Sequence, residues 1–369
     1  MKIVAAVSRE GQPAPRLEDV LLDEPRADEI RVRIHAAGIC HTDLRAHQGL
    51  AWNTPRPIVL GHEGAGVVEA TGSGVLHLSP GDRVVLSGSS CGACPACRAN
   101  LPTYCREGIP RSFGGARIDR SSALKTASGE PLHGHFFGQS SFATHAIADA
   151  RGAVRIADDV PFEIAAPFGC GVITGAGTVL EAFALKPGQT IAVFGAGNVG
   201  LSAIMAARLA GARQIIAIDP LPQRRALALE LGATVAIDAA EPDIVAALRA
   251  HLPEGVDYAL NTTVIPAVYE AALRVLGMRG TAAFVSAPPQ PLSVPLPLLL
   301  GGGRSLRGIV GGDAAPQLVI PRLLDFWRQG RFPVERLVTA FPFDRIGDAF
   351  AAFHHGEVLK PVLNVEAFA

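Results

Sequence analysis

Four cysteines lie close together in a loop rich in Gly, Pro and Ser. They follow a Cys-x2-Cys-x2-Cys-x7-Cys spacing and are Cys91, Cys94, Cys97 and Cys105. Four thiolates complete the tetrahedral shell that zinc prefers and leave no coordination position for a substrate. The pattern therefore predicts a structural zinc site. The alternatives are an iron–sulfur cluster and a nucleic-acid-binding zinc module, and the balanced charge of the chain disfavours the second.

The other two cysteines lie far apart in the chain. Cys40 stands in Gly-Ile-Cys-His-Thr-Asp, and Cys170 stands in Phe-Gly-Cys-Gly. His62, in Gly-His-Glu-Gly, offers a nitrogen ligand. Two thiolates and one imidazole would form a catalytic zinc site that keeps one position for a substrate. A buried free cysteine or a core histidine is the alternative interpretation of each residue taken alone.

A glycine-rich hexapeptide follows an apolar run and opens a helical pattern. Its members are Gly195, Ala196, Gly197, Asn198, Val199 and Gly200. In this context the first glycine allows a tight turn, the second admits a pyrophosphate, and the third lets helix and strand pack closely. The motif predicts a dinucleotide site, and a glycine turn without a ligand is the alternative.

Asp219 follows Gly200 by nineteen residues and ends the next predicted strand. A carboxylate there would accept hydrogen bonds from the adenosine ribose and would repel a 2′-phosphate. We therefore expect NAD as the cofactor. Arg224 and Arg225 lie nearby and leave NADP as a less favoured possibility.

From residue 187 onward, apolar runs of strand length alternate with helical patterns, which indicates a parallel sheet covered by helices. The predicted strands are Thr190–Phe194, Gln214–Asp219, Val235–Asp238, Val256–Asn261, Gly280–Ser286 and Ser305–Val310. The predicted helices are Val199–Ala210, Pro222–Leu231, Pro242–His251 and Pro266–Leu276. Six strands are the number of a complete doubly wound dinucleotide-binding fold.

The first 165 or so residues instead hold short strand-like runs interrupted by Gly and Pro, which favours a barrel-like domain. Examples are Ile30–Ile34, Gly66–Glu69 and Arg83–Leu86. After Gly311, helices are predicted at Pro316–Gln329 and Asp344–Phe353, and this tail is expected to return to the first domain.

The composition favours two domains and a small, roughly neutral partner. The chain has 369 residues and a formal charge of −1, so it offers no bulk attraction to nucleic acid or to an anionic membrane. Its first residues do not form a signal peptide, so we expect a cytoplasmic location. The segment Leu292–Leu300 is too short to span a membrane and is interpreted as buried core.

Together these motifs identify a resemblance that runs over nearly the whole chain. The pieces GICHTD, GHEGAGVV, CGACPACRANLPTYC, FGCGVITGAGTV and VFGAGNVGL resemble the zinc-dependent medium-chain alcohol dehydrogenases. The resemblance implies a GroES-like β-barrel catalytic domain made of 1–171 and 311–369, a Rossmann domain made of 172–310, and a homodimer or homotetramer. Two zinc ions per chain and a small alcohol or aldehyde substrate are implied as well.

The resemblance also implies roles for individual residues. Cys40, His62 and Cys170 would hold the catalytic zinc with Glu63 beside it, and Asp43 would orient His62. Thr42 would take the proton of the alcohol. The remaining implied cofactor contacts are His41 and Lys360 with the pyrophosphate, Arg224 near the ribose, and Thr174 and Val199 against the nicotinamide.

Within the family, residues 135–144 and 312–317 resemble the aryl-alcohol (benzyl alcohol) branch, which implies a bulky apolar primary alcohol. The residues matching its substrate pocket are Trp52, Phe136 and Phe137, with ordinary core packing as the alternative. Arg45 occupies the family's usual position for a relay histidine, and His47 follows two residues later. Because arginine is a poor base, we expect Thr42 to pass the proton through the ribose to His47, or directly to water.

Three other functions are considered. A zinc-free quinone or enone reductase would lack both cysteine sets, and a polyol or S-hydroxymethylglutathione dehydrogenase would have a polar or cationic pocket. A non-catalytic zinc-stabilised protein would not need an incomplete metal shell. The residues therefore favour a zinc-dependent alcohol dehydrogenase that uses NAD.

Overall fold

The computed structural model describes residues 1–288 and 290–368. By its internal contacts the chain divides into two compact units. Unit 1 comprises residues 1–170, 315–325 and 334–369, and unit 2 comprises residues 171–314 and 326–333. These are geometric units, and the domain boundaries given above stay a prediction.

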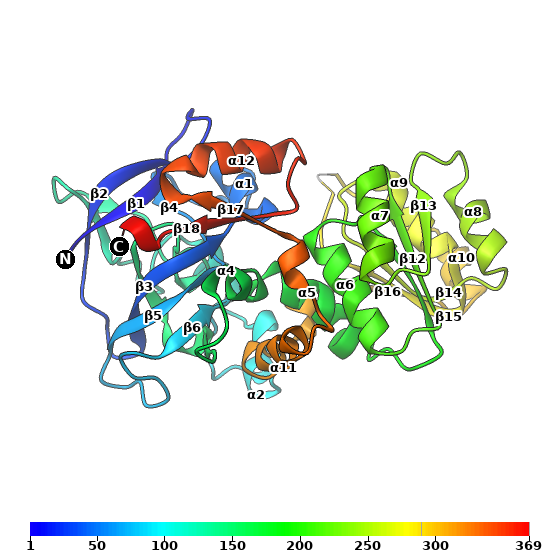
Figure 1. The fold of residues 1–369 in the computed structure, drawn as a ribbon, viewed down its shortest axis with the longest axis horizontal. Coiled ribbons are helices and arrows are strands. Elements are labelled where there is room, and N and C mark those ends of the chain that lie inside the picture. Colours follow the sequence, from blue (N-terminus) through cyan, green and yellow to red (C-terminus); the bar gives the residue numbers. More distant parts are fainter. Residues whose placement is uncertain (289, 369) are drawn as a thin grey trace. The chain divides into compact units, whose positions relative to one another are not determined.

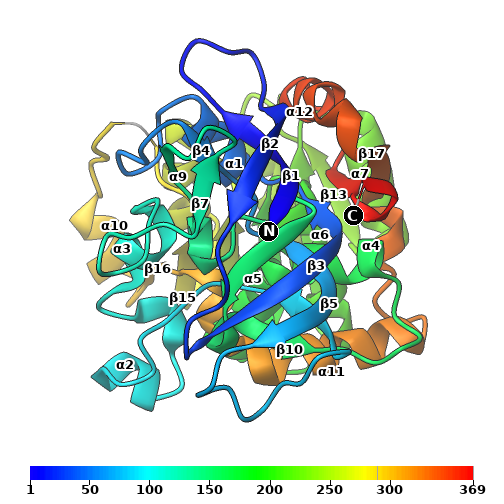
Figure 2. The same cartoon turned by 90° about the vertical axis from the view of Figure 1, so that its left-hand side faces the viewer.

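Unit 1 is built on two antiparallel-rich sheets (Figures 1 and 2). The five-stranded sheet has the order β4-β1-β2-β7-β8, with β1 Lys2–Ser8, β2 Arg16–Leu22, β4 Ile58–Val59, β7 Leu124–Thr126 and β8 Pro131–Leu132. The other has the order β10-β6-β5-β3-β18-β17, and β9 also pairs with β3. Its strands are β3 Glu29–Gly38, β5 Gly64–Thr71, β6 Arg83–Leu86, β9 His145–Asp149, β10 Ala153–Arg155, β17 Val338–Pro342 and β18 Lys360–Asn364.

β3 organises this second sheet because it pairs antiparallel with β5, β9 and β18. Its residues are almost all buried, as expected of a central strand. The pairing of β18 with the end of β3 sets Val362 opposite Gly38, so that Lys360 lies near Ile39 although it follows 321 residues later. A continuous apolar core contains residues of both sheets.

The helices of unit 1 are mostly short. They are α1 His41–His47, α2 Pro95–Arg98, α3 Gly108–Phe113, α4 Phe162–Ala165 and α12 Ile346–His354. A longer helix, α11 Pro316–Arg328, has its first ten residues in unit 1 and its last three in unit 2, and it runs close to its predicted bounds. No single helix among residues 1–288 and 290–368 has both the length and the apolar composition to cross a membrane. The bent pair Phe162–Gly169 and Gly171–Ala182 reaches that length and composition only when its two helices are taken together.

Unit 2 contains a parallel six-stranded sheet in the order β13-β12-β11-β14-β15-β16 (Figure 1). The strands are β11 Thr190–Phe194, β12 Gln214–Asp219, β13 Val235–Asp238, β14 Val256–Asn261, β15 Leu276–Phe284 and β16 Ser305–Gly308. Its longer helices are α6 Asn198–Leu209, α7 Pro222–Leu231, α8 Ile244–His251 and α9 Pro266–Arg274. The predicted doubly wound fold is confirmed, since this is its usual strand order.

Two local predictions in unit 2 need correction. Helix α8 begins at Ile244 because the Asp243 carboxylate caps it by accepting from the Ala246 N–H, which leaves Pro242 outside. Strand β15 begins four residues earlier than predicted and includes Gly277 and Arg279, at a register irregularity opposite β14.

The interpretation of Leu292–Leu300 as buried core was wrong. Its only helix, α10 Leu296–Leu300, has no buried residue, and Leu296 and Leu300 are 63% and 83% exposed. Pro295 and Pro297 explain the error, because a proline lacks the N–H that a strand or a longer helix would need.

Candidate functional site

Three separate segments of unit 1 bring Cys40, His62, Glu63 and Cys170 together. Cys40 caps the N-terminus of α1, His62 and Glu63 precede β5, and Cys170 follows a short helical turn. One ligand atom of each residue lies within 4.8 Å of the others. The Nε2 atom of His62 is buried without a hydrogen-bond partner among the described residues. Two thiols beside an unpartnered imidazole nitrogen are a donor set that fits zinc.

Asp43 holds this cluster from the side opposite the thiols. One carboxylate oxygen accepts from His62 Nδ1 at 3.0 Å and from the Gly61 N–H at 3.1 Å. The other accepts from the Cys40 N–H at 3.0 Å. Burial alone would lower the pKa of His62, but the Asp43 carboxylate outweighs it and raises that pKa well above its usual value. In the neutral ring the bond places the hydrogen on Nδ1 and leaves Nε2 as the ligand atom.

The two thiols of the cluster differ strongly in acidity. A hydrogen bond from Cys170 lowers the pKa of Cys40 well below its ordinary value. The same bond, together with burial, raises the pKa of Cys170. The hydrogen bond between the two sulfur atoms thus makes Cys40 the more acidic thiol of the pair.

Glu63 is held by Lys360 in a fully buried ion pair. Lys360 Nζ lies 2.8 and 3.0 Å from the two carboxylate oxygens and donates to the Ile39 carbonyl at 2.9 Å. Burial raises the pKa of Glu63, although the charge of Lys360 acts in the opposite direction. For Lys360 the charge of Glu63 outweighs burial and raises the pKa. Each Glu63 oxygen keeps a further lone pair, so the carboxylate remains one of the four groups that could hold a metal. The predicted contact of Lys360 with a pyrophosphate gains no support from these partners.

Helix α1 carries the expected proton-transfer residues. Thr42 is half-buried, with its hydroxyl 3.9 Å from the Cys40 sulfur. His47 is buried, and its ring nitrogens lie 2.7 Å from the Ser8 hydroxyl and 2.9 Å from the Gln12 carbonyl. Both nitrogens therefore have partners inside the fold. The predicted route to His47 gains no support from this arrangement, and the direct route from Thr42 to water fits it better.

Aromatic rings form a wall beside His62. Phe137 stacks on the His62 ring with centroids 4.5 Å apart, and Phe113 contacts Phe137 at 5.1 Å. Trp52 packs on Phe113 at 4.4 Å and is 63% exposed. Phe136 is fully buried in the core, which favours the core alternative for that residue. Phe113, the last residue of α3, was missed because no period or motif in its sequence marks an aromatic residue as functional.

The four-cysteine loop brings its sulfur atoms equally close together. The Sγ atoms of Cys91, Cys94, Cys97 and Cys105 lie within 4.8 Å of one another. Backbone N–H groups of Cys97 and Arg106 lower the pKa of Cys94 to about 6, whereas burial raises the pKa of Cys105 to about 11. The sulfur set and its N–H donors fit a closed tetrahedral zinc shell.

The glycine-rich loop of unit 2 has the shape that a pyrophosphate requires. Gly195 has φ +92°, and a Cβ at Gly200 would lie 1.8 Å from the Gly195 carbonyl oxygen, so both positions require glycine. A Cβ at Gly197 would meet nothing within 4 Å, which leaves open space at the N-terminus of α6. The buried Oδ1 of Asn198 has no partner among the described residues. The open helix N-terminus fits an anionic ligand, whereas the Asn198 Oδ1 is an acceptor that would need a donor.

Asp219 is almost fully buried behind this loop. Its carboxylate accepts from the Ala196 N–H at 2.8 Å and from the Leu221 N–H at 2.9 Å. Arg225 is tied to the Asp219 and Pro220 carbonyls and forms an ion pair with Asp238 at 2.9 Å.

The remaining predicted cofactor residues come from several elements, and the backbone beside Thr174 packs on Val199. His41, in unit 1, is exposed and packs on Phe353. Thr174 and Val199 are half-buried on helices α5 Gly171–Gly177 and α6, and Arg224 lies on α7.

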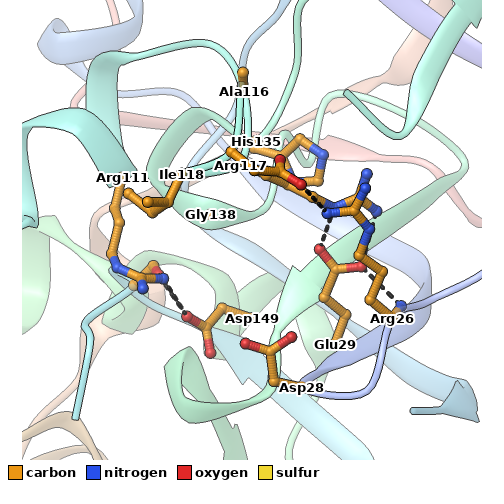
Figure 3. A pocket seen from close by; sticks show the side chains of 12 residues that line it. Arg26, Asp28, Glu29, Arg111, Ala116, Arg117, Ile118, His135, Gly138 and Asp149 are labelled. Atoms are coloured by element: carbon orange, nitrogen blue, oxygen red, sulfur yellow. Dashed lines mark hydrogen bonds and ion pairs between the residues drawn. The ribbon is translucent and has the colours of Figure 1, made fainter. Parts of the chain in front are cut away.

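A separate cavity of about 310 Å³ in unit 1 is lined by charged residues that already pair with one another (Figure 3). Arg117 binds both oxygens of Glu29 at 2.6 and 2.8 Å, and Arg111 contacts Asp149 at 3.3 Å. Burial first, and then the Arg117 charge, lowers the pKa of His135 to about 4. A neutral, apolar alcohol would gain little from such a lining, so the cavity is a poor candidate for its binding site.

Comparison with known proteins agrees with this fold. Residues 26–158 match the family model of the alcohol dehydrogenase GroES-like domain, and residues 198–328 match that of the zinc-binding dehydrogenase. A geraniol dehydrogenase of Castellaniella defragrans is 47% identical over 97% of this chain and 96% of its own length.

Two solved structures are similar over 99% of both chains. An alcohol dehydrogenase zinc-binding domain protein from Burkholderia ambifaria has a TM-score of 0.96 and 47% identity. A benzyl alcohol dehydrogenase from Acinetobacter calcoaceticus has a TM-score of 0.94 and 38% identity.

The fold and sites thus define an oxidoreductase that acts on alcohols and aldehydes with zinc and a nicotinamide dinucleotide. The chain belongs to the zinc-dependent medium-chain alcohol dehydrogenase family. This membership favours an enzyme that acts on alcohols over the zinc-free reductase and the non-catalytic zinc protein named above.

Proposed function

We propose that this enzyme interconverts apolar primary alcohols and their aldehydes, with an aromatic or other unsaturated group next to the reacting carbon. The observation that carries the proposal is Phe137 stacked on His62, which places an aromatic face beside the proposed metal ligands. Flat unsaturated groups pack well against such a face. The names of two relatives, a geraniol and a benzyl alcohol dehydrogenase, fit the same substrate class.

We further propose that Cys40, His62 and Cys170 hold the catalytic zinc, and that the four cysteines between 91 and 105 hold a second, structural zinc. When bound, the catalytic zinc would supply a Lewis acid that lowers the pKa of the alcohol. Asp43 fixes the His62 ring, and Thr42 accepts the alcohol proton and passes it to water. Phe137 and Phe113 exclude water from one side of the reacting carbon.

NAD is the proposed cofactor, in preference to NADP. Gly197 admits the pyrophosphate, and the Asp219 carboxylate accepts from the ribose hydroxyls. A 2′-phosphate would meet the charge of Asp219, while Arg225 is already committed to Asp238. Replacing Asp219 by Asn should lower the NAD-to-NADP ratio of kcat/KM at least about tenfold, since removal of one charge relieves the repulsion. An unchanged ratio would remove Asp219 from cofactor selection.

We also propose a homodimer or homotetramer in the cytoplasm. The edge strand β16 is exposed at all four residues, and Met278, Leu300 and Val310 are exposed nearby in the sequence of unit 2. An unpaired edge with apolar neighbours favours pairing with a second copy. All six cysteines are free thiols, as expected in a reducing compartment. Light scattering of the purified protein would test the assembly, and a monomer would contradict it.

A substrate panel with both cofactors tests the proposed reaction. The panel contains benzyl alcohol, geraniol, ethanol, sorbitol and S-hydroxymethylglutathione, each with NAD and with NADP. We expect kcat/KM for benzyl alcohol or geraniol to exceed that for ethanol about a hundredfold, because the larger group buries more apolar surface. Preference for sorbitol or for the glutathione adduct would contradict the proposed substrate class.

A further inference from the structure

Gln139 is a buried amide that bonds to the backbone on both sides of Glu63. Its Oε1 accepts from the Gly64 N–H at 3.1 Å, and its Nε2 donates to the His62 carbonyl at 3.0 Å. The same Nε2 donates to the Ser87 carbonyl at 3.2 Å. Only 2% of Gln139 is exposed, so these bonds face little competition from water.

The Ser87 side chain extends this network to the segment that carries Cys170. Ser87 follows strand β6, and its hydroxyl donates to the Gly169 carbonyl at 2.7 Å. Gly169 directly precedes Cys170. A chain of buried hydrogen bonds therefore runs from the backbone of His62 through Gln139 and Ser87 to the residue before Cys170.

The segment that carries Gln139 also contacts the His62 ring. Phe137 stacks on that ring, and the hydroxyl of Ser140 donates to the Val59 carbonyl at 2.6 Å and accepts from the Phe136 N–H at 2.9 Å. Phe137 and Ser140 have φ values of +53° and +56°, which non-glycine residues rarely adopt. The fold thus holds this segment in an unfavourable backbone conformation. In that conformation Phe137 packs on the ring of His62, and Gln139 bonds to the backbone of the same residue.

We propose that Gln139 and Ser87 are positioning residues that set the spacing between the metal ligands His62 and Cys170. The inference rests on the proposed metal site. Asp43 fixes the orientation of the His62 ring, and its other hydrogen bonds run to the backbone of Cys40 and Gly61 rather than to the Cys170 segment. The amide suits Gln139 because only a side chain with both a donor and an acceptor can serve an N–H and two carbonyls.

Glycine at position 64 is part of the same arrangement. A Cβ there would lie 3.1 Å from Gln139 Oε1 and 2.6 Å from the Ser141 Cβ. Glycine is required here mainly because a Cβ would collide with Ser141, and its absence also gives the Gln139 amide room beside the backbone. The Ser141 hydroxyl, in contrast, is buried without a partner among the described residues. Ser141 therefore offers a matched control: a buried serine near Gln139 whose hydroxyl bonds to neither ligand segment, so that its replacement by Ala leaves the backbone bond to Gly61 in place.

Release of zinc from the holoenzyme to a colorimetric chelator tests the proposal. The variants are Gln139→Met, Ser87→Ala and Ser87→Thr, with Ser141→Ala as the control. The Cys40→Ser variant is expected to hold zinc only at the four-cysteine site, so its release curve identifies the phase that belongs to that site. We expect Gln139→Met and Ser87→Ala to speed release of the other zinc about 10- to 100-fold, which is typical when a group that orients a metal ligand is lost.

The four-cysteine phase should stay unchanged, Ser87→Thr should restore slow release, and Ser141→Ala should match wild type. Release within about threefold of wild type in both Gln139→Met and Ser87→Ala would overturn the positioning role. If Gln139→Met does not fold, the pair Ser87→Ala and Ser87→Thr decides the question. Wild-type protein that binds only one zinc would instead contradict the proposed metal site itself.

Discussion

The two sulfur clusters of unit 1 are assembled in opposite ways. Cys91, Cys94, Cys97 and Cys105 lie on one loop, and neighbouring backbone N–H groups such as that of Cys94 donate to their sulfur atoms. The cluster of Cys40, His62 and Cys170 spans 130 residues and depends on side chains from other segments.

The two clusters therefore depend to different degrees on the rest of the protein. A loop can bind its ion by folding only itself, so its metal stabilises the local structure and needs little support from elsewhere. The dispersed cluster exists only when the two-sheet core is formed, so its geometry is set by the whole unit. A site built in this way can keep an incomplete shell for chemistry, which a closed four-thiolate loop cannot.

Replacing Cys40 by Ser gives the largest expected effect. The variant should lose one of two zinc ions and at least about a thousandfold in kcat/KM, because Lewis-acid stabilisation of the alkoxide is lost. Metal analysis and turnover of benzyl alcohol measure the two losses. The fold should persist, since β3 and its neighbours do not depend on the metal. Near wild-type turnover would show that the dispersed cluster is not catalytic.

Replacing Cys97 by Ser tests the role of the four-cysteine loop. Loss of the loop zinc should lower the free energy of unfolding by at least about 2 kcal/mol, because metal binding contributes to the folding of this loop. Urea unfolding of wild type and variant gives the difference. Activity per molecule that retains the remaining zinc should change little. If catalysis instead falls as far as in Cys40→Ser, the assignment of separate roles is wrong.

Replacing Asp43 by Asn tests the support of the dispersed site. The amide keeps the size of the side chain, but it loses the charge and one acceptor among the three bonds to Cys40, Gly61 and His62. Zinc affinity of this site should weaken about 10- to 100-fold, with the loop zinc unaffected. Chelator competition measures both affinities. Equal weakening at the two sites would indicate general destabilisation.

Lowering the pH should destabilise the folded protein through His135, which lies in the segment beside the dispersed site. Burial, aided by the Arg117 charge, lowers the pKa of His135 from an ordinary 6.5 to about 4. At pH values between these two, His135 is protonated in the unfolded chain but neutral in the folded chain. The free energy of unfolding therefore falls as the pH drops from 7 toward 5. The effect at pH 5 should be about 2 kcal/mol.

The variant His135→Gln keeps an acceptor for the Ala123 N–H and removes the titration. Its loss of stability between pH 7 and pH 5 should therefore be smaller than that of wild type by about 2 kcal/mol. Urea unfolding of both proteins at the two pH values gives the comparison, in which effects of acid on the zinc ligands cancel. Equal losses would show that His135 does not titrate in this range.

The predictability of the fold follows the same division between local and dispersed features. Strands such as Thr190–Phe194 and Gln214–Asp219 were predicted to the residue because buried parallel strands are short apolar runs with clear ends. Leu292–Leu300 misled the same reasoning. Its apolar composition indicates burial, but its two prolines remove the donors with which it could join a sheet or a longer helix.

The candidate site was predictable only where chemistry marks a residue type. Cysteines and the histidine at position 62 stand out because few other residues bind zinc. The partners that position them do not: Gln139 is an ordinary amide until the fold sets it beside Gly64, and Lys360 reaches Glu63 only through the pairing of β18 with β3. Such contacts depend on tertiary structure, which no local pattern records.

The most direct test of the central claim is a crystal structure of the zinc-loaded protein with data collected at the zinc absorption edge. We expect an anomalous peak about 2.3 Å from the sulfur atoms of Cys40 and Cys170 and about 2.1 Å from His62 Nε2, with a second peak inside the four-cysteine loop. A disulfide between Cys40 and Cys170, or a zinc-loaded loop with no peak among Cys40, His62 and Cys170, would contradict it.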